Sequence, residues 1–223
     1  MDAVKRKTTP IRILHVVGGM NRGGIETWLM HVLRHIDREM YRMDFLVHTA
    51  RPCAYDTEIW DLGSRIIPCL HPSRPWWYAR NFFRALHAFG PYDIVHSHVH
   101  HFSGLVLRLA HRAGVLMRIA HSHNDASPVD GRARLPRRLY LRLMERWIAH
   151  HATLGLAASP EAAASLYGPH WADDPNRRVL YCGIDLAPFR SLLDGAAVRR
   201  EFGIPDGAYV VGHVGRFFPQ KNH

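Results

Sequence analysis

Short apolar runs alternate with helical patterns throughout this chain, and that alternation constrains its fold more than any other feature of the sequence. Runs bounded by glycine or turn residues are expected as buried strands at residues 11–17, 43–48, 65–67, 94–98, 118–121, 154–158 and 179–181. Helical periodicity lies between them, at residues 25–36, 76–89, 103–113, 136–150 and 160–167. Strands that alternate with helices predict an α/β fold, a doubly wound parallel sheet with helices on both faces.

The pattern changes after residue 181, which indicates a domain boundary near residues 185–190. A connector is followed by a short helical pattern at residues 196–202 and a further expected strand at residues 209–214. We therefore expect a disordered lead-in over residues 1–10, a first domain over residues 11–188, and a linker with the truncated start of a second domain over residues 189–223.

Cysteine usage and hydropathy favour a cytoplasmic protein. The three cysteines, Cys53, Cys69 and Cys182, are odd in number and widely spaced, which argues against a disulfide scaffold. No apolar run approaches the ~20 residues of a membrane-spanning helix. The basic first residues are not followed by the apolar stretch of a secretory signal.

The net charge of +10 and the pI near 10.1 call for an anionic partner or a basic solvated surface. Nucleic acid, an anionic membrane face and a phosphorylated small substrate all fit, and charge alone does not choose among them. Arginines interleave with leucines over residues 132–147, where a packed helix with a solvated basic face and a helix that touches anionic lipid weigh equally. Because no nucleic-acid motif accompanies this segment, we expect no nucleic-acid partner.

The segment Gly18–Glu26 (GGMNRGGIE) joins the first expected strand to the first expected helix. Glycines let a backbone approach a ligand closely, and a helix N-terminus favours anions. The segment is neither a dinucleotide fingerprint nor a P-loop, because GxGxxG is absent and Ile25 and Glu26 stand where Lys and Ser/Thr belong. The alternative is a tight turn that needs positive φ; four glycines within seven residues favour the close approach.

Histidines gather where two expected strands end. His96 and His98 (DIVHSHVHH) point to the same face of one strand. A metal site is discounted, since no Asp, Glu or Cys at ligand spacing completes the set nearby; His96 is expected to be a buried, hydrogen-bonded core residue and His98 to face a polar cleft. His121 ends the next strand and His123 follows it (RIAHSHND), where a histidine can donate to a sugar hydroxyl or stabilise charge as a bond breaks.

The last residues, YVVGHVGRFFPQKNH, combine an expected strand with two cations in the loop that follows it. Arg216 and Lys221 would project from the carboxyl end of that strand. Two cations at this spacing suit a diphosphate.

Taken in order, six segments resemble the family 4 glycosyltransferases of the two-domain GT-B fold, in the branch that builds capsules and exopolysaccharides. They are GGMNRGGIETWL, DIVHSH, RIAHSHN, LAASPEAAASLYG, VLYCGID and VGHVGRFFPQKNH, and the resemblance runs from residue 11 to residue 223. It implies a Rossmann-like N-terminal domain that holds the acceptor and a C-terminal domain that holds a nucleotide sugar. It also implies hexosyl transfer with retention of configuration to a lipid-linked or polysaccharide acceptor, at the inner face of the membrane.

The resemblance also assigns roles to single residues. His121 would be the catalytic histidine, in contact with the sugar near its reacting carbon. His98 and His123 would bind substrate, and Gly23 and Gly24 would lie against the donor phosphates or the transferred sugar. Arg216 and Lys221 would neutralise the departing diphosphate, so that neither a metal nor another cofactor is implied; a UDP-linked sugar is the commonest donor of the family.

In one respect the sequence departs from the family pattern, and this departure changes the activity that we expect of the chain. The family's later acidic motif, two glutamates seven residues apart, would follow His223, so the chain as given is expected to transfer no sugar by itself. The alternatives are a non-catalytic module that binds an acceptor or a phosphorylated ligand and, with less support, a nucleic-acid binder.

Overall fold

The computed structural model describes residues 9–125, 134–190, 194–215 and 217. The chain divides into two units, Met1–Ile184 and Asp185–His223. The first unit holds all the strands among the described residues, and the second holds short helices only.

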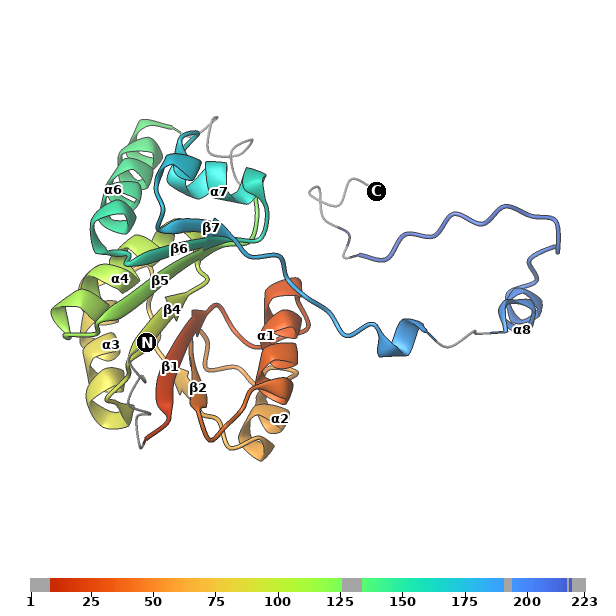
Figure 1. The fold of residues 1–223 in the computed structure, drawn as a ribbon, viewed down its shortest axis with the longest axis horizontal. Helices are drawn as coiled ribbons and strands as arrows, with labels where there is room; N and C mark the ends of the chain where they lie inside the picture. The colour runs from red at the N-terminus through yellow and green to blue at the C-terminus, as the bar shows by residue number, and fades with distance from the viewer. Residues whose placement is uncertain (1–8, 126–133, 191–193, 216, 218–223) are drawn as a thin grey trace, which may run out of the picture. The chain divides into compact units, whose positions relative to one another are not determined.

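A sheet of seven parallel strands forms the centre of the first unit (Figure 1). Its strands are β1 (Ile11–Val17), β2 (Tyr41–Val47), β3 (Ile66–Pro68), β4 (Ile94–Ser97), β5 (Met117–Ser122), β6 (Leu154–Ala157) and β7 (Arg177–Val179), in the order β3-β2-β1-β4-β5-β6-β7. Every neighbouring pair is parallel. The predicted α/β class and the doubly wound parallel sheet are confirmed.

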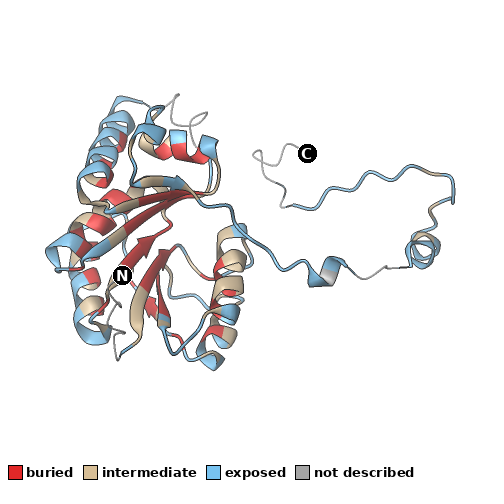
Figure 2. Ribbon diagram, in the orientation of Figure 1, coloured by how far each residue is buried: buried red, intermediate tan, exposed pale blue. Residues whose placement is uncertain are grey.

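Helices connect the strands and cover both faces of the sheet. They are α1 (Gly24–His35), α2 (Asp56–Asp61), α3 (Pro75–Phe89), α4 (Ser103–Arg112), α6 (Leu135–His151) and α7 (Pro160–Tyr167). Alternate residues of β1 enter two different cores: Leu14 packs in the cluster that includes α3 and α4, and Val17 packs in the cluster that includes α1 and α2. This alternation follows from the two-residue period of a strand. It leaves the central strands buried from both sides (Figure 2).

Local sequence signals explain several element boundaries. Ser159 caps α7 by accepting a hydrogen bond from the amide of Ala162 at 3.2 Å, and Pro160 occupies the first turn, as the Ser-Pro pair predicts. Helix α2 was not predicted, since two turns are too short for a clear apolar period. The same holds for the 3-10 turns η1 (His100–Phe102), η2 (Trp171–Asp173) and η3 (Ala187–Phe189).

The second unit differs from expectation at one place. Its described elements are η3 and α8 (Gly195–Glu201), whereas the expected strand at residues 209–214 is wrong for this structure. These residues pair with no strand of the described chain, and Val211 and Val214 are exposed. A β-strand needs a hydrogen-bonded neighbour, and apolar composition alone does not supply one.

Candidate functional site

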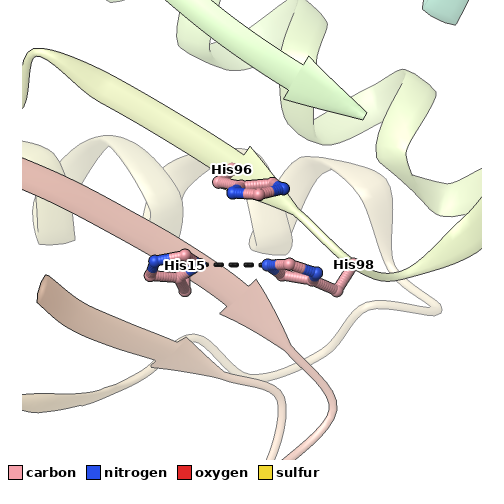
Figure 3. A group of neighbouring side chains, drawn as sticks. All are labelled: His15, His96 and His98. Atoms are coloured by element: carbon pink, nitrogen blue, oxygen red, sulfur yellow. Dashed lines mark hydrogen bonds between the residues drawn. The ribbon is translucent and has the colours of Figure 1, made fainter. Parts of the chain in front are cut away.

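Five histidines meet where the parallel strands of the sheet have their C-terminal ends, which we call the carboxyl edge. His15 lies in β1, His96 in β4 and His121 in β5, while His98 and His123 follow β4 and β5 directly. Because these strands are parallel and adjacent, their carboxyl ends lie together; His15 and His96 are direct partners in the β1–β4 ladder. Figure 3 shows His15, His96 and His98 converging from the two neighbouring strands.

Hydrogen bonds link the five rings into two groups, which we call the histidine cluster. His15 Nδ1 lies 3.0 Å from His98 Nε2, and His98 Nδ1 lies 2.9 Å from His123 Nε2. In the second group His96 Nε2 lies 3.2 Å from His121 Nδ1, and these two rings stack with an interplanar angle of 8°. The predicted buried, hydrogen-bonded state of His96 agrees with this geometry.

Burial keeps the histidine cluster uncharged. Loss of hydration lowers the pKa of His15 to about 3, and burial together with the neighbouring histidines lowers the pKa of His121 to about 2 and that of His123 to about 4. The same two causes, burial first, hold the pKa of His96 and His98 well below the usual range. At neutral pH each ring therefore has one N–H donor and one lone pair.

One nitrogen of the histidine cluster has no hydrogen-bond partner among the described residues. His121 is fully buried, its Nδ1 faces His96, and its Nε2 is buried without a partner. The indole of Trp28, from α1, stands edge-on to the ring of His121 at 5.4 Å between centroids. A buried polar atom without a partner costs about 1–3 kcal/mol, so this nitrogen is a candidate contact point for a ligand.

The glycine segment lies between β1 and α1, the helix that carries Trp28. Neither Gly18, Gly19, Gly23 nor Gly24 has positive φ, so the tight-turn alternative is not supported. A side chain at position 19 would meet Thr49 Cγ2 at 2.9 Å, and one at position 23 would meet the carboxylate of Glu26. Positions 18 and 24 have no atom within 4 Å of where a Cβ would stand, so the backbone there is open to a ligand.

The structure describes only some of the predicted site residues. Arg216 and Lys221 lie outside the described residues. His98, His121 and His123 come together, as described above, whereas His15 was missed because it lies 83 residues from His98 in sequence. The signal that could have found it is its position near the end of the first strand, in register with the DIVHSH strand.

Two groups within the histidine cluster have the geometry to hold a metal ion. Single ring nitrogens of His15, His96 and His98 lie within 4.8 Å of one another, and the same is true of His98, His121 and His123. Along the chain no Asp, Glu or Cys at ligand spacing completes a metal site with His96 and His98, whereas the fold supplies further histidines from other strands.

Helix α6 buries a narrower face than its sequence suggests. Leu141, Met144 and Ile148 face the core, while Leu135, Leu139 and Leu143 are exposed at intervals of four residues, among arginines. Among the described residues, no helix has both the length and the apolar content needed to cross a membrane.

The glycosyl transferase 4-like domain family matches residues 23–183, which is well over half of the chain and includes His98, His121 and His123. The chain belongs to this family. The predicted resemblance to family 4 glycosyltransferases is confirmed at this level.

Relatives and solved structures agree with this assignment. EpsF of Bacillus subtilis (strain 168), a protein named as a glycosyltransferase, is 36% identical over 217 residues, which cover 95% of this chain and 56% of EpsF. The D-inositol 3-phosphate glycosyltransferase of Mycobacterium leprae (strain Br4923) is 34% identical over 143 residues, 61% of this chain and 32% of that protein. The chain thus spans about half of EpsF and about a third of the second relative.

Structures of low sequence identity share the fold. The HepE protein of Anabaena, in complex with UDP, superposes with a TM-score of 0.65 at 17% identity, over 86% of this chain and 50% of that one. The lipopolysaccharide outer core galactosyltransferase WaaB gives a TM-score of 0.51 at 14% identity, over 79% of this family 4-like chain and 47% of WaaB. The described fold therefore matches half of a GT-B structure.

Proposed function

We propose that this family 4-like chain forms the acceptor-side half of a retaining glycosyltransferase, which moves a hexose from a UDP-linked donor to a lipid-linked or polysaccharide acceptor. In this proposal residues 11–188 are the acceptor-side domain, and residues 189–223 are the linker and the start of the nucleotide-sugar domain. The observation that carries it is the buried, neutral and unpartnered Nε2 of His121 at the ligand-binding edge of a family 4-like sheet.

His121 has the properties required of a group that contacts the sugar. Its Nδ1 is held by His96, so the ring has a fixed orientation, and the low pKa keeps it neutral. A neutral Nε2 can hydrogen-bond a sugar hydroxyl near the reacting carbon without bringing a full charge into the site. Half-buried His123 and buried His98 are proposed to complete the wall around the substrate.

The glycine segment favours the sugar over the phosphates as its ligand. A side chain at position 23 would meet the carboxylate of Glu26, so that carboxylate lies close to the backbone of Gly23. A carboxylate accepts hydrogen bonds from hydroxyl groups and repels phosphate. Gly24 offers open backbone beside it, and the charge of the diphosphate is left to Arg216 and Lys221, whose fixed positive charges would stabilise the leaving group as its bond breaks.

The test is sugar transfer by a protein extended to the length of its relatives. His121→Gln should lower kcat about 100- to 1,000-fold, the effect typical of losing one transition-state contact, with unchanged circular dichroism. Arg216→Ala and Lys221→Ala should act similarly, and His111→Gln, at an exposed position in the last turn of α4, is the control. Rates unchanged in all three site variants would refute the proposal, as would sugar transfer by the 223-residue chain alone.

The exposed leucines of α6 support a membrane-facing acceptor site, and we propose the cytoplasmic side as its location. Leu135, Leu139 and Leu143 could enter the lipid interface while neighbouring arginines meet anionic headgroups. Each arginine near an anionic surface contributes about 1 kcal/mol, so changing Arg137, Arg138 and Arg142 to Ala should weaken binding to vesicles with anionic lipid by about two orders of magnitude.

The matched control for the vesicle experiment removes the same charge elsewhere, by changing Arg190, Arg199 and Arg200 to Ala in the second unit. Equal losses in both triple variants would show that net charge, and not α6, governs binding. Vesicle binding that survives the α6 changes would make the helix a solvated basic face.

A further inference from the structure

We propose that His98, His121 and His123 form a binding site for one divalent transition metal of the Zn²⁺ class. One ring nitrogen from each residue lies within 4.8 Å of one from each of the others, and the three residues come from the ends of neighbouring strands β4 and β5. Their number and type match the three-histidine sites that leave a fourth metal position open.

The hydrogen bonds of the two buried ligands support this site. Metal-binding histidines almost always donate their other ring N–H to an acceptor, which fixes the ring. His98 can donate from Nε2 to Nδ1 of His15, and His121 can donate from Nδ1 to Nε2 of His96. These two bonds leave Nδ1 of His98 and Nε2 of His121 as the nitrogens that can bind an ion.

The third ligand is already at almost the required distance. Nδ1 of His98 lies 2.9 Å from Nε2 of His123, and two nitrogens bound tetrahedrally to Zn²⁺ at 2.0–2.1 Å stand about 3.3 Å apart. Metal binding would lengthen this separation by a few tenths of an ångström and turn both rings so that their lone pairs converge on the ion, with the proton of His123 moved to its Nδ1. His123 is half-buried, unlike the other two ligands, and gives the ion a route from solvent.

The other histidine group, His15, His96 and His98, is a weaker candidate. All three residues are buried, so no member of this group offers an ion a route from solvent; Figure 3 shows the three rings. Nε2 of His96 is bonded to His121. Among the described residues, no nitrogen of that group is both fully buried and without a partner, and none of its three residues is half-buried.

The ligand type selects the metal. Three imidazole nitrogens suit Zn²⁺, Co²⁺, Ni²⁺ or Cu²⁺, whereas Mg²⁺ and Ca²⁺ require oxygen ligands. One consequence rests on the proposed function: an ion on Nε2 of His121 would occupy the atom offered to the sugar, so the metal would inhibit transfer and the sugar donor would protect against it.

The test is metal binding by the 223-residue chain, stripped with a chelator and dialysed. Co²⁺ should bind with one equivalent and give the visible absorption of a tetrahedral nitrogen site, and Zn²⁺ should displace it, while Mg²⁺ should not bind. His121→Gln and His123→Gln should abolish this one-equivalent signal. His15→Gln, next to the ligands, should weaken binding 10- to 100-fold and keep the stoichiometry.

A control separates this site from the other histidines of the chain, which number 18 in total. The paired change His111→Gln and His151→Gln removes two neighbouring histidines elsewhere and should leave Co²⁺ binding unchanged. Circular dichroism checks folding, and if buried His121→Gln does not fold, half-buried His123→Gln carries the test.

Three results would overturn the proposal: no one-equivalent binding, binding unaffected by His123→Gln, or binding lost in His15→Gln and retained in His123→Gln. Because the titration uses no sugar, its failure would leave the proposed transfer reaction untouched. Conversely, a metal bound by a chain whose extended form transfers no sugar would leave the metal site standing.

Discussion

The two edges of the sheet, at the amino-terminal and the carboxyl-terminal ends of its strands, differ in how fully their buried polar groups are hydrogen-bonded. Near the amino-terminal edge, Asp44 in β2 accepts hydrogen bonds from the amide of Arg65 at 2.9 Å and the hydroxyl of Tyr92 at 2.8 Å, and it pairs with Arg12 at 3.3 Å. At the carboxyl edge, the histidine cluster contains no carboxylate and leaves Nε2 of His121 without a partner. The first arrangement stabilises the fold, and the second is available to a ligand.

The volume of a cavity does not by itself identify the candidate ligand site in this fold. A hollow of about 910 Å³ lies beside the amino-terminal edge, lined in part by Arg12, Asp44 and Arg65. The side chains of Arg12 and Asp44 and the backbone amide of Arg65 are engaged in the network just described. Open α/β sheets bind ligands at the other edge. Unsatisfied hydrogen-bonding capacity therefore favours the carboxyl edge as the candidate site, whereas cavity volume alone would favour the other edge.

We expect acidic pH to cause the largest loss of stability, through the histidine cluster at the carboxyl edge. The folded-state pKa of each histidine in the cluster lies below the unfolded value of about 6.5, so the unfolded chain binds more protons as the pH falls. The stability is fully present above about pH 6.5, and each histidine removes up to about 1.4 kcal/mol per pH unit below it. We expect several kcal/mol of loss and cooperative unfolding between about pH 6 and pH 4.

Urea unfolding at a series of pH values, with chelator present, measures this loss. His15→Leu should reduce the slope of stability against pH by about one proton in the acid range, because it removes one group that stays neutral only in the folded state. A free energy of unfolding that is unchanged between pH 7 and pH 5 would contradict the neutral, buried state of the histidine cluster.

Asp44→Ala should cause the next largest loss of stability, because it removes the centre of the polar network near the amino-terminal edge. The change leaves the buried hydroxyl of Tyr92 without its acceptor and Arg12 without its anion, which typically costs about 3–5 kcal/mol. Glu58→Ala is the control, since its ion pair with Arg34 is partly exposed and should contribute less than about 1 kcal/mol. Urea unfolding at pH 7 compares the two, and similar small losses would show that the Asp44 network is not structural.

The sequence carried most of the fold and part of the site. Short apolar runs placed most of the strands, and the 3.6-residue period placed the longer helices, because those patterns are local. The expected strand at residues 209–214 failed because pairing is not local, and the contact between His15 and His98 depends on the β1–β4 register across 83 residues. The choice between a turn and a close approach at the glycine segment needed the backbone angles themselves.

The smallest loss of stability is expected for His121→Leu, and this change compares the two edges most directly. His121→Leu leaves Nε2 of His96 without its partner, but it also removes the unpartnered nitrogen of His121, so the net loss should be about 1 kcal/mol. Replacing both partners, His96→Leu with His121→Leu, removes the whole polar pair and should restore stability to that of the parent chain or above it.

A double-mutant cycle at pH 7 with chelator present measures this difference as a coupling of about 1–2 kcal/mol between the two sites. If the losses simply added, the histidine pair would stabilise the fold as Asp44 does, and the contrast between the edges would disappear. A double variant that is as stable as the parent would mean that these histidines contribute little to the fold, because a leucine pair serves the core equally well. What they contribute would then be the binding of a ligand at the carboxyl edge.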